Sequence, residues 1–227
     1  MARSAETPRL LPVEDLGETK AKILEAAFRR LASDGYAALS VREIARDAGV
    51  NHALINYHFR TKDQLVIAVL EEANRQLIAR QQRMYGEPRS FAEKWAEARR
   101  FYADDLASGF VRVQAELFAA SFSNPELREK FLVLIGAWKA VVLGGVREAV
   151  AAFEASGGKL PRFVTPEAIS TWVSEFWLGM EFADLLGASE ELAPHGAALD
   201  AMQSLLELLD ARVAKKPARA SRGRRRS

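Results

Sequence analysis

Five side chains along one short segment combine hydrogen-bonding chemistry with a helical period. Ile55 and Phe59 lie four residues apart and would share the inward face of a helix. His52, Asn56 and Tyr57 then face outward together. An Asn amide both accepts and donates, as the edge of adenine requires, and His and Tyr can donate to a base or a phosphate. The pattern predicts a helix that enters the major groove of DNA.

Neighbouring residues supply the other contacts that such a helix needs. Ala53 and the rim of Leu54 can touch a thymine methyl group. Lys62 stands at the start of the next predicted helix, where free amides favour a phosphate. Arg42 begins the preceding helix and can reach the backbone or a base edge. The candidate DNA-contacting residues are Ser40, Arg42, Asn51, His52, Ala53, Leu54, Asn56, Tyr57, His58 and Lys62.

Three of these candidates also have a purely structural interpretation. Tyr57 and His58 are suited to holding phosphates, but Tyr57 could instead pack between helices. His58 could be a partly buried structural histidine. Arg42 could be a solvated surface cation.

The elements that must position these side chains have the spacing of a helix-turn-helix. Ser40 to Glu43 reads as a capping box that opens a short helix. Ala45 is small enough to let two helices cross, and Gly49 tolerates the positive φ of the turn. Asn51 is a good N-cap for the helix that carries Ile55.

The remaining periodicity is helical, so the sequence predicts an all-α fold. The stripe that starts at Ile23 ends at Gly35, and a second capping box from Thr61 to Gln64 opens a helix that runs to about Arg83. Gly86 to Arg89 is the clearest break between the short helices and the long ones. Beyond it we expect helices over residues 90–107, 110–122, 125–156, 165–186 and 197–214.

Composition is that of a globular protein. Of 227 residues, 49% are hydrophobic and 27% are charged. No segment approaches the roughly 18 apolar residues of a membrane span, and the first residues do not read as a signal peptide. Cysteine is absent, which excludes disulfides and thiolate sites. We expect a cytoplasmic protein.

The charge is unevenly placed along the chain. Seven cations and no acid lie from Lys215 to the end. The remaining 25 cations stand against 30 acids, so residues 1–214 carry a net charge of −5. Overall charge therefore does not argue for DNA binding, and the motif must carry that inference. The basic tail is of low complexity and is expected to be disordered.

The sequence contains no motif that indicates an enzyme. The sequence has no phosphate-binding or dinucleotide glycine pattern, no metal-spaced His/Cys set and no nucleophile with a base. His52 and His58 lie on the predicted recognition helix, far along the chain from His195. We predict that the protein is not an enzyme and uses no cofactor and no metal.

The sequence resembles the tetracycline-repressor (TetR) family over about residues 19–70. The residues that carry the resemblance are Ile23-Leu24, Ala26-Ala27-Phe28, Gly35-Tyr36, Ser40 to Ala45, Ala48-Gly49-Val50, Tyr57-His58-Phe59 and Lys62 to Leu65. One departure bears on DNA contact: the family usually has tyrosine at the position of Asn56, and here tyrosine is displaced to Tyr57.

The resemblance implies an N-terminal three-helix DNA-binding domain, a larger helical ligand-binding and dimerisation domain, and a homodimer. We divide the chain into a flexible arm (1–18), the helix-turn-helix domain (19–66), the larger domain (67–214) and the basic tail (215–227). The function implied is a transcriptional repressor that a small-molecule effector releases from a palindromic operator. Activation remains open, and the alternatives are a sequence-nonspecific architectural DNA-binding protein or a structural helical protein.

The second half of the chain is rich in aromatic residues, most of which should form core. Some could instead line an apolar pocket. The candidate ligand-binding residues are Trp95, Tyr102, Phe118, Phe122, Trp138, Trp177, Met180 and Glu181. Residues 171–186 and 199–213 are apolar on more than one face, which favours a dimer interface over burial within one subunit.

Overall fold

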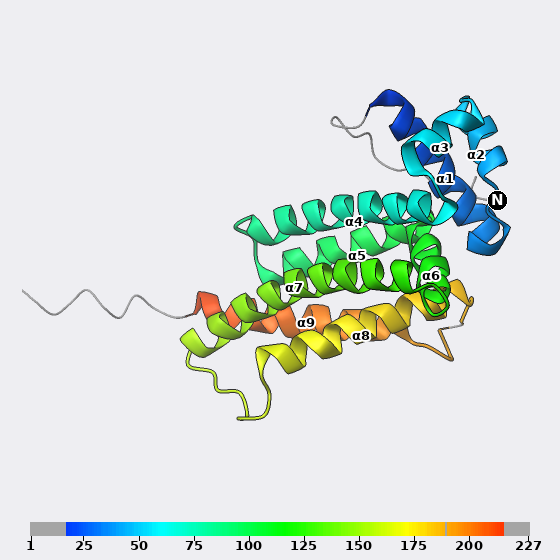
Figure 1. Ribbon diagram of the computed structural model, residues 1–227. Helices are drawn as coiled ribbons and strands as arrows, with labels where there is room; N and C mark the ends of the chain where they lie inside the picture. The colour runs from blue at the N-terminus through cyan, green and yellow to red at the C-terminus, as the bar shows by residue number, and fades with distance from the viewer. Residues whose placement is uncertain (1–16, 189, 216–227) are drawn as a thin grey trace, which may run out of the picture.

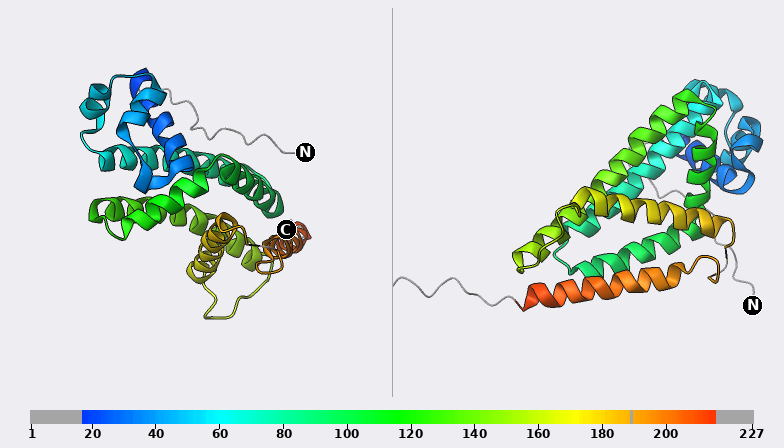
Figure 2. Two further views of the ribbon diagram at one scale, coloured as in Figure 1. Left: turned by 90° about the vertical axis from the view of Figure 1, so that its right-hand side faces the viewer. Right: turned by 90° about the horizontal axis from the view of Figure 1, so that it is seen from below.

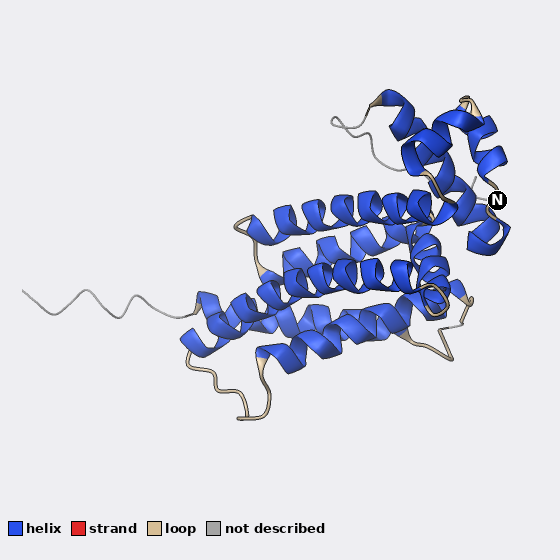
Figure 3. Ribbon diagram, viewed as in Figure 1, coloured by secondary structure: helices blue, strands red, loops and turns tan. Residues whose placement is uncertain are grey.

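The computed structural model describes residues 17–188 and 190–215, which form nine helices and no strand (Figures 1 and 3). A small N-terminal unit of three helices sits at one end of a larger body of long helices. The helices are α1 (Glu18–Ala38), α2 (Val41–Ala48), α3 (His52–Phe59), α4 (Lys62–Gly86), α5 (Phe91–Ala107), α6 (Phe110–Ser121), α7 (Pro125–Ala155), α8 (Pro166–Leu185) and α9 (His195–Ala214). The predicted all-α fold is confirmed.

Side-chain caps place several helix starts where the sequence predicts them. The Asn51 side chain accepts from the backbone N–H of Ala53 at 2.8 Å and starts α3. Asn124 and Thr165 cap α7 and α8 in the same way, and each is followed by a proline at the first helical position. Proline costs nothing there because that N–H has no partner within a helix.

The predicted capping boxes are only partly present. Ser40 is the N-cap of α2, but its side chain makes no capping hydrogen bond. The Glu43 carboxylate lies 3.6 Å from Arg30 and from Arg46 instead, so these cations compete for it. The Thr61 hydroxyl does accept from the backbone of the residue three positions on. A complete box forms at Ser90, where the sequence analysis did not place one.

The break predicted at Gly35 is a kink rather than the end of a helix. Gly35 has φ 79° and ψ 172°, a conformation that is essentially restricted to glycine, and a short helical turn continues to Ala38. A Cβ atom at Gly35 would lie 2.8 Å from both carboxylate oxygens of Glu116. Two independent constraints, φ and space, therefore require glycine.

One continuous core joins the small unit to the body. The largest cluster of buried residues draws on α1, α2, α3, α4, α6 and α7. From the small unit come Phe28, Ile44 and Ile55, and from the body come Leu117 and Phe131. Since these side chains share one core, a shift of α6 or α7 must be felt by the first three helices.

The long helices of the body pack against one another in pairs. Within the body α4 and α8 both pack against α7, and α5 packs against α9. Figure 2 shows α8 and α9 on the side of the body remote from the small unit. None of the described helices is long and apolar enough to cross a membrane.

Candidate functional site

Helix α3 presents nearly all of its side chains to solvent. Ile55 and Phe59 are 2% and 4% exposed, and the other six residues of the helix are exposed. The predicted inward and outward faces of this helix are therefore confirmed. On the outer face the Asn56 amide nitrogen lies 3.4 Å from His52 Nδ1, one helical turn away.

Tyr57 and His58 are both on the outside. The Tyr57 side chain is 80% exposed, and its ring meets that of His58 edge-on at 5.2 Å. Tyr57 therefore does not pack between helices, and His58 is not a buried structural histidine. Both rings are free to meet a nucleic acid.

The residues expected on the flank of this surface have different surroundings. Arg42, in the first turn of α2, is exposed. Ser40 is partly exposed, and its hydroxyl is not used as a cap. Both side chains are available to a phosphate beside α3.

Lys62 has a structural partner that the sequence analysis did not foresee. Its ammonium donates to the backbone carbonyl of Tyr36 at 2.7 Å and lies 4.5 Å from the centre of the Tyr36 ring. This contact ties the start of α4 to the end of α1. One ammonium hydrogen is thereby committed, which leaves two for any phosphate.

An ion-pair network fixes α2 against α1. Arg30 donates to Asp47 at 2.6 Å and to Asp34 at 2.9 Å. These hydrogen bonds raise the pKa of Arg30 and hold the pKa of Asp47 below its usual range. Because α3 follows α2 after a tight turn at Gly49, with φ 65°, this network also orients α3.

A second polar cluster joins the small unit to the body. The Tyr36 backbone N–H donates to Glu116 on α6 at 3.0 Å. The Tyr36 hydroxyl donates to Asp63 at 2.6 Å, and Asp63 also accepts from Asn124 at 2.8 Å. Burial raises the pKa of Tyr36, and the hydrogen bond to Asp63 raises it further. Tyr36 thus contacts α4 and α6 at once, and reaches α7 through Asp63.

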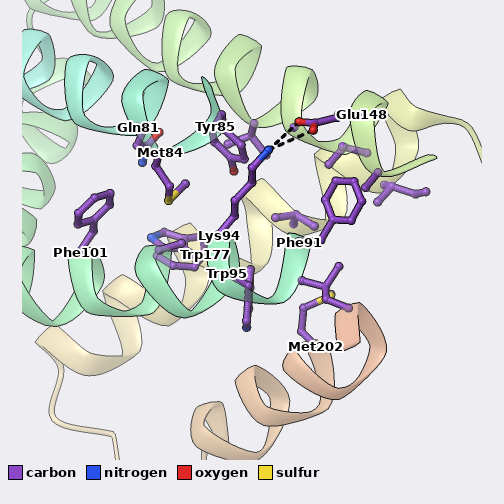
Figure 4. A pocket seen from close by; sticks show the side chains of 18 of the residues that line it. Gln81, Met84, Tyr85, Phe91, Lys94, Trp95, Phe101, Glu148, Trp177 and Met202 are labelled. Atoms are coloured by element: carbon purple, nitrogen blue, oxygen red, sulfur yellow. Dashed lines mark hydrogen bonds and ion pairs between the residues drawn. The ribbon is translucent and has the colours of Figure 1, made fainter. Parts of the chain in front are cut away.

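The body contains a cavity of about 1170 Å³ that is partly open to solvent. Its lining comes from α4 to α9 and is mainly aromatic and aliphatic. Five of the predicted ligand-binding residues line it, namely Trp95, Tyr102, Trp138, Trp177 and Glu181. Figure 4 shows Trp95 and Trp177 in this space with Phe91, Phe101 and Met202, contributed by α5, α8 and α9. Such a space suits an apolar molecule of considerable size.

Three predicted ligand-binding residues do not line the cavity. Phe122 is 70% exposed and lies edge-on to Phe118, with the ring centres 5.0 Å apart. Phe118 packs against Phe131 and Phe182. Met180 is 1% exposed and belongs to the small core cluster with Tyr102 and Leu199. Helical period alone did not separate the cavity side of these helices from the core and surface sides.

Polar groups interrupt the apolar lining at a few points. The Lys94 ammonium reaches from α5 to both carboxylate oxygens of Glu148 on α7, at 3.1 Å each (Figure 4). Arg80 binds Asp105, and burial raises the pKa of Asp105 to about 6 despite that partner. Burial, followed by the charge of Asp105, raises the pKa of Glu181 to about 8.

Lys94, Gln81 and Asp105 line the cavity but were not among the predicted ligand-binding residues. The signal that could have found them is an isolated polar residue on a helical face that is otherwise apolar. Among the described residues, no group of three His, Asp or Glu side chains is arranged to hold a metal ion.

Comparison with known proteins identifies the N-terminal part. Residues 23–69 match the family model described as bacterial regulatory proteins, tetR family. An HTH-type transcriptional repressor of Mycobacterium tuberculosis is 50% identical over 60 residues, which is 26% of this chain and 32% of that protein. Over residues 23–69 the chain therefore has the sequence of a TetR-family regulator.

The TetR-family match covers α1 to α3 and the first part of α4. This chain spans about a third of the length of the mycobacterial relatives that it matches. The fatty acid metabolism regulator protein of Bacillus subtilis matches more of the chain, with 26% identity over 67% of this chain and 82% of that protein.

Solved structures share the whole fold. The transcriptional regulator FadR from Bacillus subtilis, in complex with stearoyl-CoA, superposes with a TM-score of 0.64. It is 23% identical in sequence, and the match covers 84% of this chain and 97% of that one. The body that contains the cavity therefore has the fold of a known regulator, although its sequence has diverged.

Proposed function

We propose that this TetR-family protein is a DNA-binding regulator of transcription that a small molecule controls. The observation that carries the proposal is the position of α6. This helix lines the cavity on one side and contacts the helix-turn-helix unit on the other. As a regulator of chromosomal genes, the protein would act in the cytoplasm.

The exposed face of α3 supports DNA binding. Asn56 and His52 lie one turn apart, where they can reach adjacent base pairs in a major groove. Tyr57, His58 and Arg42 are exposed beside them and suit phosphate contacts. We place the DNA-binding domain at residues 19–66 and the ligand-binding domain at residues 67–214.

The cavity supports control by a largely apolar ligand. The structure of FadR from Bacillus subtilis holds stearoyl-CoA, whose acyl chain is apolar. The cavity in this chain has the volume and the lining to take an apolar chain of that kind. Its aromatic walls would bury most of such a ligand, so the hydrophobic effect would supply much of the affinity.

Helix α6 connects the ligand cavity to the helix-turn-helix unit. Phe110 and Gln114 line the cavity, while Val113 and Leu117 are buried in the core shared with α1. Glu116 binds Tyr36 from the same helix. A ligand that displaces Phe110 or Gln114 would therefore tilt the helix-turn-helix unit. It alters DNA affinity only by its differential affinity for the two tilts.

A homodimer is the assembly that this function requires. On α8, Trp172 is 62% exposed, and on α9, Leu205 and Leu208 are 60% and 68% exposed although they also border the cavity. Leu186, which follows α8, is 86% exposed. Large apolar side chains left in solvent along two terminal helices suit an isologous interface. Two α3 helices in a dimer would read a palindrome whose half-sites lie about one DNA turn or a multiple apart.

Selection from random duplexes tests the proposal. The full chain should enrich a palindromic sequence and bind it far more tightly than scrambled DNA. Sedimentation at micromolar concentration should give about twice 25.1 kDa. Loss of sequence preference, or a monomer with intact helicity, would refute this function.

Ligand control has a test of its own. An apolar extract of the source cell should shift operator affinity for the wild-type protein. Trp177→Ala and Trp138→Ala, which remove bulk from the cavity wall, should blunt that shift and leave operator affinity unchanged. A response that survives both substitutions would place the ligand elsewhere.

A further inference from the structure

One buried acid of the cavity has no cationic partner, because the lining cations Arg212 and Lys215 are exposed at the C-terminal end of α9. Lys94 and Glu148 neutralise each other, because the ammonium contacts both carboxylate oxygens. Arg80 similarly compensates Asp105. Glu181 is 9% exposed and lines the cavity from α8. In the described part of the chain no Lys, Arg or His side chain forms an ion pair with Glu181, and burial together with the charge of Asp105 raises its pKa.

One hydrogen-bond acceptor of the cavity lining also lacks a partner. The side-chain oxygen of Gln81 is buried and has no donor in the described part of the chain. Gln81 lines the same cavity from α4 (Figure 4). A buried acceptor without a donor costs free energy, so a ligand that brings a donor gains by meeting it. Gln81 therefore offers an acceptor to a ligand donor in the cavity that Glu181 also lines.

Aromatic rings surround the unbalanced acid. The Trp177 ring lies one turn before Glu181 on α8 and meets Trp95 and Tyr102 edge-on at 5.9 and 5.4 Å. Aromatic faces attract cations, and the attraction strengthens where water is excluded. A carboxyl group beside three such rings is a site for an organic cation and a poor one for an anion.

We propose that the effector is an amphipathic amine, with a long apolar body and a protonated amino end held by Glu181 within the aromatic cluster. This inference rests on the proposed function, whose ligand class it specifies. The apolar body would lie along the aliphatic side chains of α7 and α9, which line the rest of the cavity. The Lys94–Glu148 pair is already neutral, and the other lining cations, Arg212 and Lys215, are exposed at the C-terminal end of α9.

Because amine binding would ionise Glu181, the affinity for an amine should depend on pH. The groups that face Glu181 are Asp105 and Tyr102 on α5, while Arg80 on α4 acts through Asp105. Because burial raises the pKa of Glu181 to about 8, the group is mostly neutral at pH 7 without ligand. A bound ammonium would ionise it and expel a proton. Amine affinity should therefore rise between pH 6 and 8.5, where an alkylamine stays protonated as a lysine does (pKa about 10.4).

The test compares three probes with the same chain: decylamine, decanol and decanoate. Three of the four tryptophans line the cavity, so intrinsic fluorescence of the full-length protein reports binding. Decylamine should bind about tenfold or more tightly than decanol, with decanoate the weakest. Glu181→Gln should abolish that advantage and leave decanol affinity unchanged. Glu175→Gln, on the outer side of the same helix, is the matched control and should change nothing.

The outcomes separate the ligand class from the proposed function. Tightest binding by decanoate, or decylamine affinity that Glu181→Gln leaves intact, would overturn the amine proposal while preserving a ligand cavity. If none of the three probes binds, the ligand site itself fails, whereas sequence-specific DNA binding is measured independently. Circular dichroism of Glu181→Gln checks folding, which loss of a buried acid should not impair.

Discussion

The Glu116 carboxylate on α6 accepts a hydrogen bond from the backbone N–H of Tyr36, 80 residues earlier in the chain, at 3.0 Å. The same carboxylate fills the space where a Cβ at Gly35 would stand. Helix α6, which lines the cavity, thus contacts the kink at the end of α1 through Glu116. This hydrogen bond links a cavity-lining helix directly to the DNA-binding unit.

Removing the Glu116 carboxylate should weaken the coupling between the cavity and the DNA-binding unit. In Glu116→Ala the Tyr36 N–H loses its partner, which costs roughly 1–3 kcal/mol of stability. The ligand-induced change in operator affinity should shrink more than the affinity of the free protein does. Glu129→Ala, an exposed glutamate on α7, is the control for charge. Unchanged ligand response in Glu116→Ala would show that coupling runs through the apolar core instead.

Gly35→Ala should destabilise the protein for two reasons at once. Its φ of 79° with ψ 172° is strained for any residue with a Cβ, by roughly 1–3 kcal/mol, and that Cβ also meets Glu116. Gly86→Ala is the control, since a Cβ there meets nothing within 4 Å. Urea unfolding measures both variants. Equal stability of the two would contradict the structural account of the kink.

Arg60, between α3 and α4, has φ 48° and is the one described non-glycine residue with positive φ. The Thr61 N–H donates to the Phe59 carbonyl across it, which makes a tight γ-turn. Arg60→Gly should therefore raise the free energy of unfolding by about 1 kcal/mol, because glycine relieves the strain. Arg60→Ala keeps the Cβ and should not. A similar gain in both variants would mean that the arginine charge, and not φ, was responsible.

Stability should fall as pH rises through the neutral range. Glu181 and Asp105 have pKa values raised to about 8 and about 6, so the folded state binds more protons than the unfolded chain above pH 5. Stability therefore decreases with pH until the folded-state pKa values are passed. The Tm of the wild type should drop between pH 6 and 8.5, and Glu181→Gln should flatten most of that drop. An identical pH dependence in the variant would remove Glu181 as the cause.

The sequence was informative where local rules decide the structure. Asn51 caps α3 as predicted, because an N-cap needs only the residue and its next turn. It was less informative where partners are distant in the chain. Lys62 binds a carbonyl 26 residues away, and Glu43 is drawn from its predicted cap towards Arg30.

The cavity shows the same limit. Trp177 and Phe122 are both large aromatic residues that the sequence places on helices, yet Trp177 lines the cavity, whereas Phe122 follows the end of α6 and is 70% exposed. Helical period reports which residues share a face, and the packing of six helices decides what that face meets. Because the sequence does not show that packing, only five of the eight predicted ligand-binding residues line the cavity. The predictions for the arm before residue 17 and the tail beyond residue 215 lie outside the described residues.

The central claim is that α3 reads DNA sequence through its exposed face, and Asn56→Ala tests it most directly. Wild type and variant are titrated on the selected operator and on a scrambled duplex at several salt concentrations, with Arg42→Ala as the phosphate-contact control. Asn56→Ala should lose about 1–3 kcal/mol on the operator and little on scrambled DNA. Arg42→Ala should weaken both and reduce the salt slope by about one unit per subunit. Equal losses on both duplexes for Asn56→Ala would contradict sequence reading by this residue and leave Tyr57 as the better candidate.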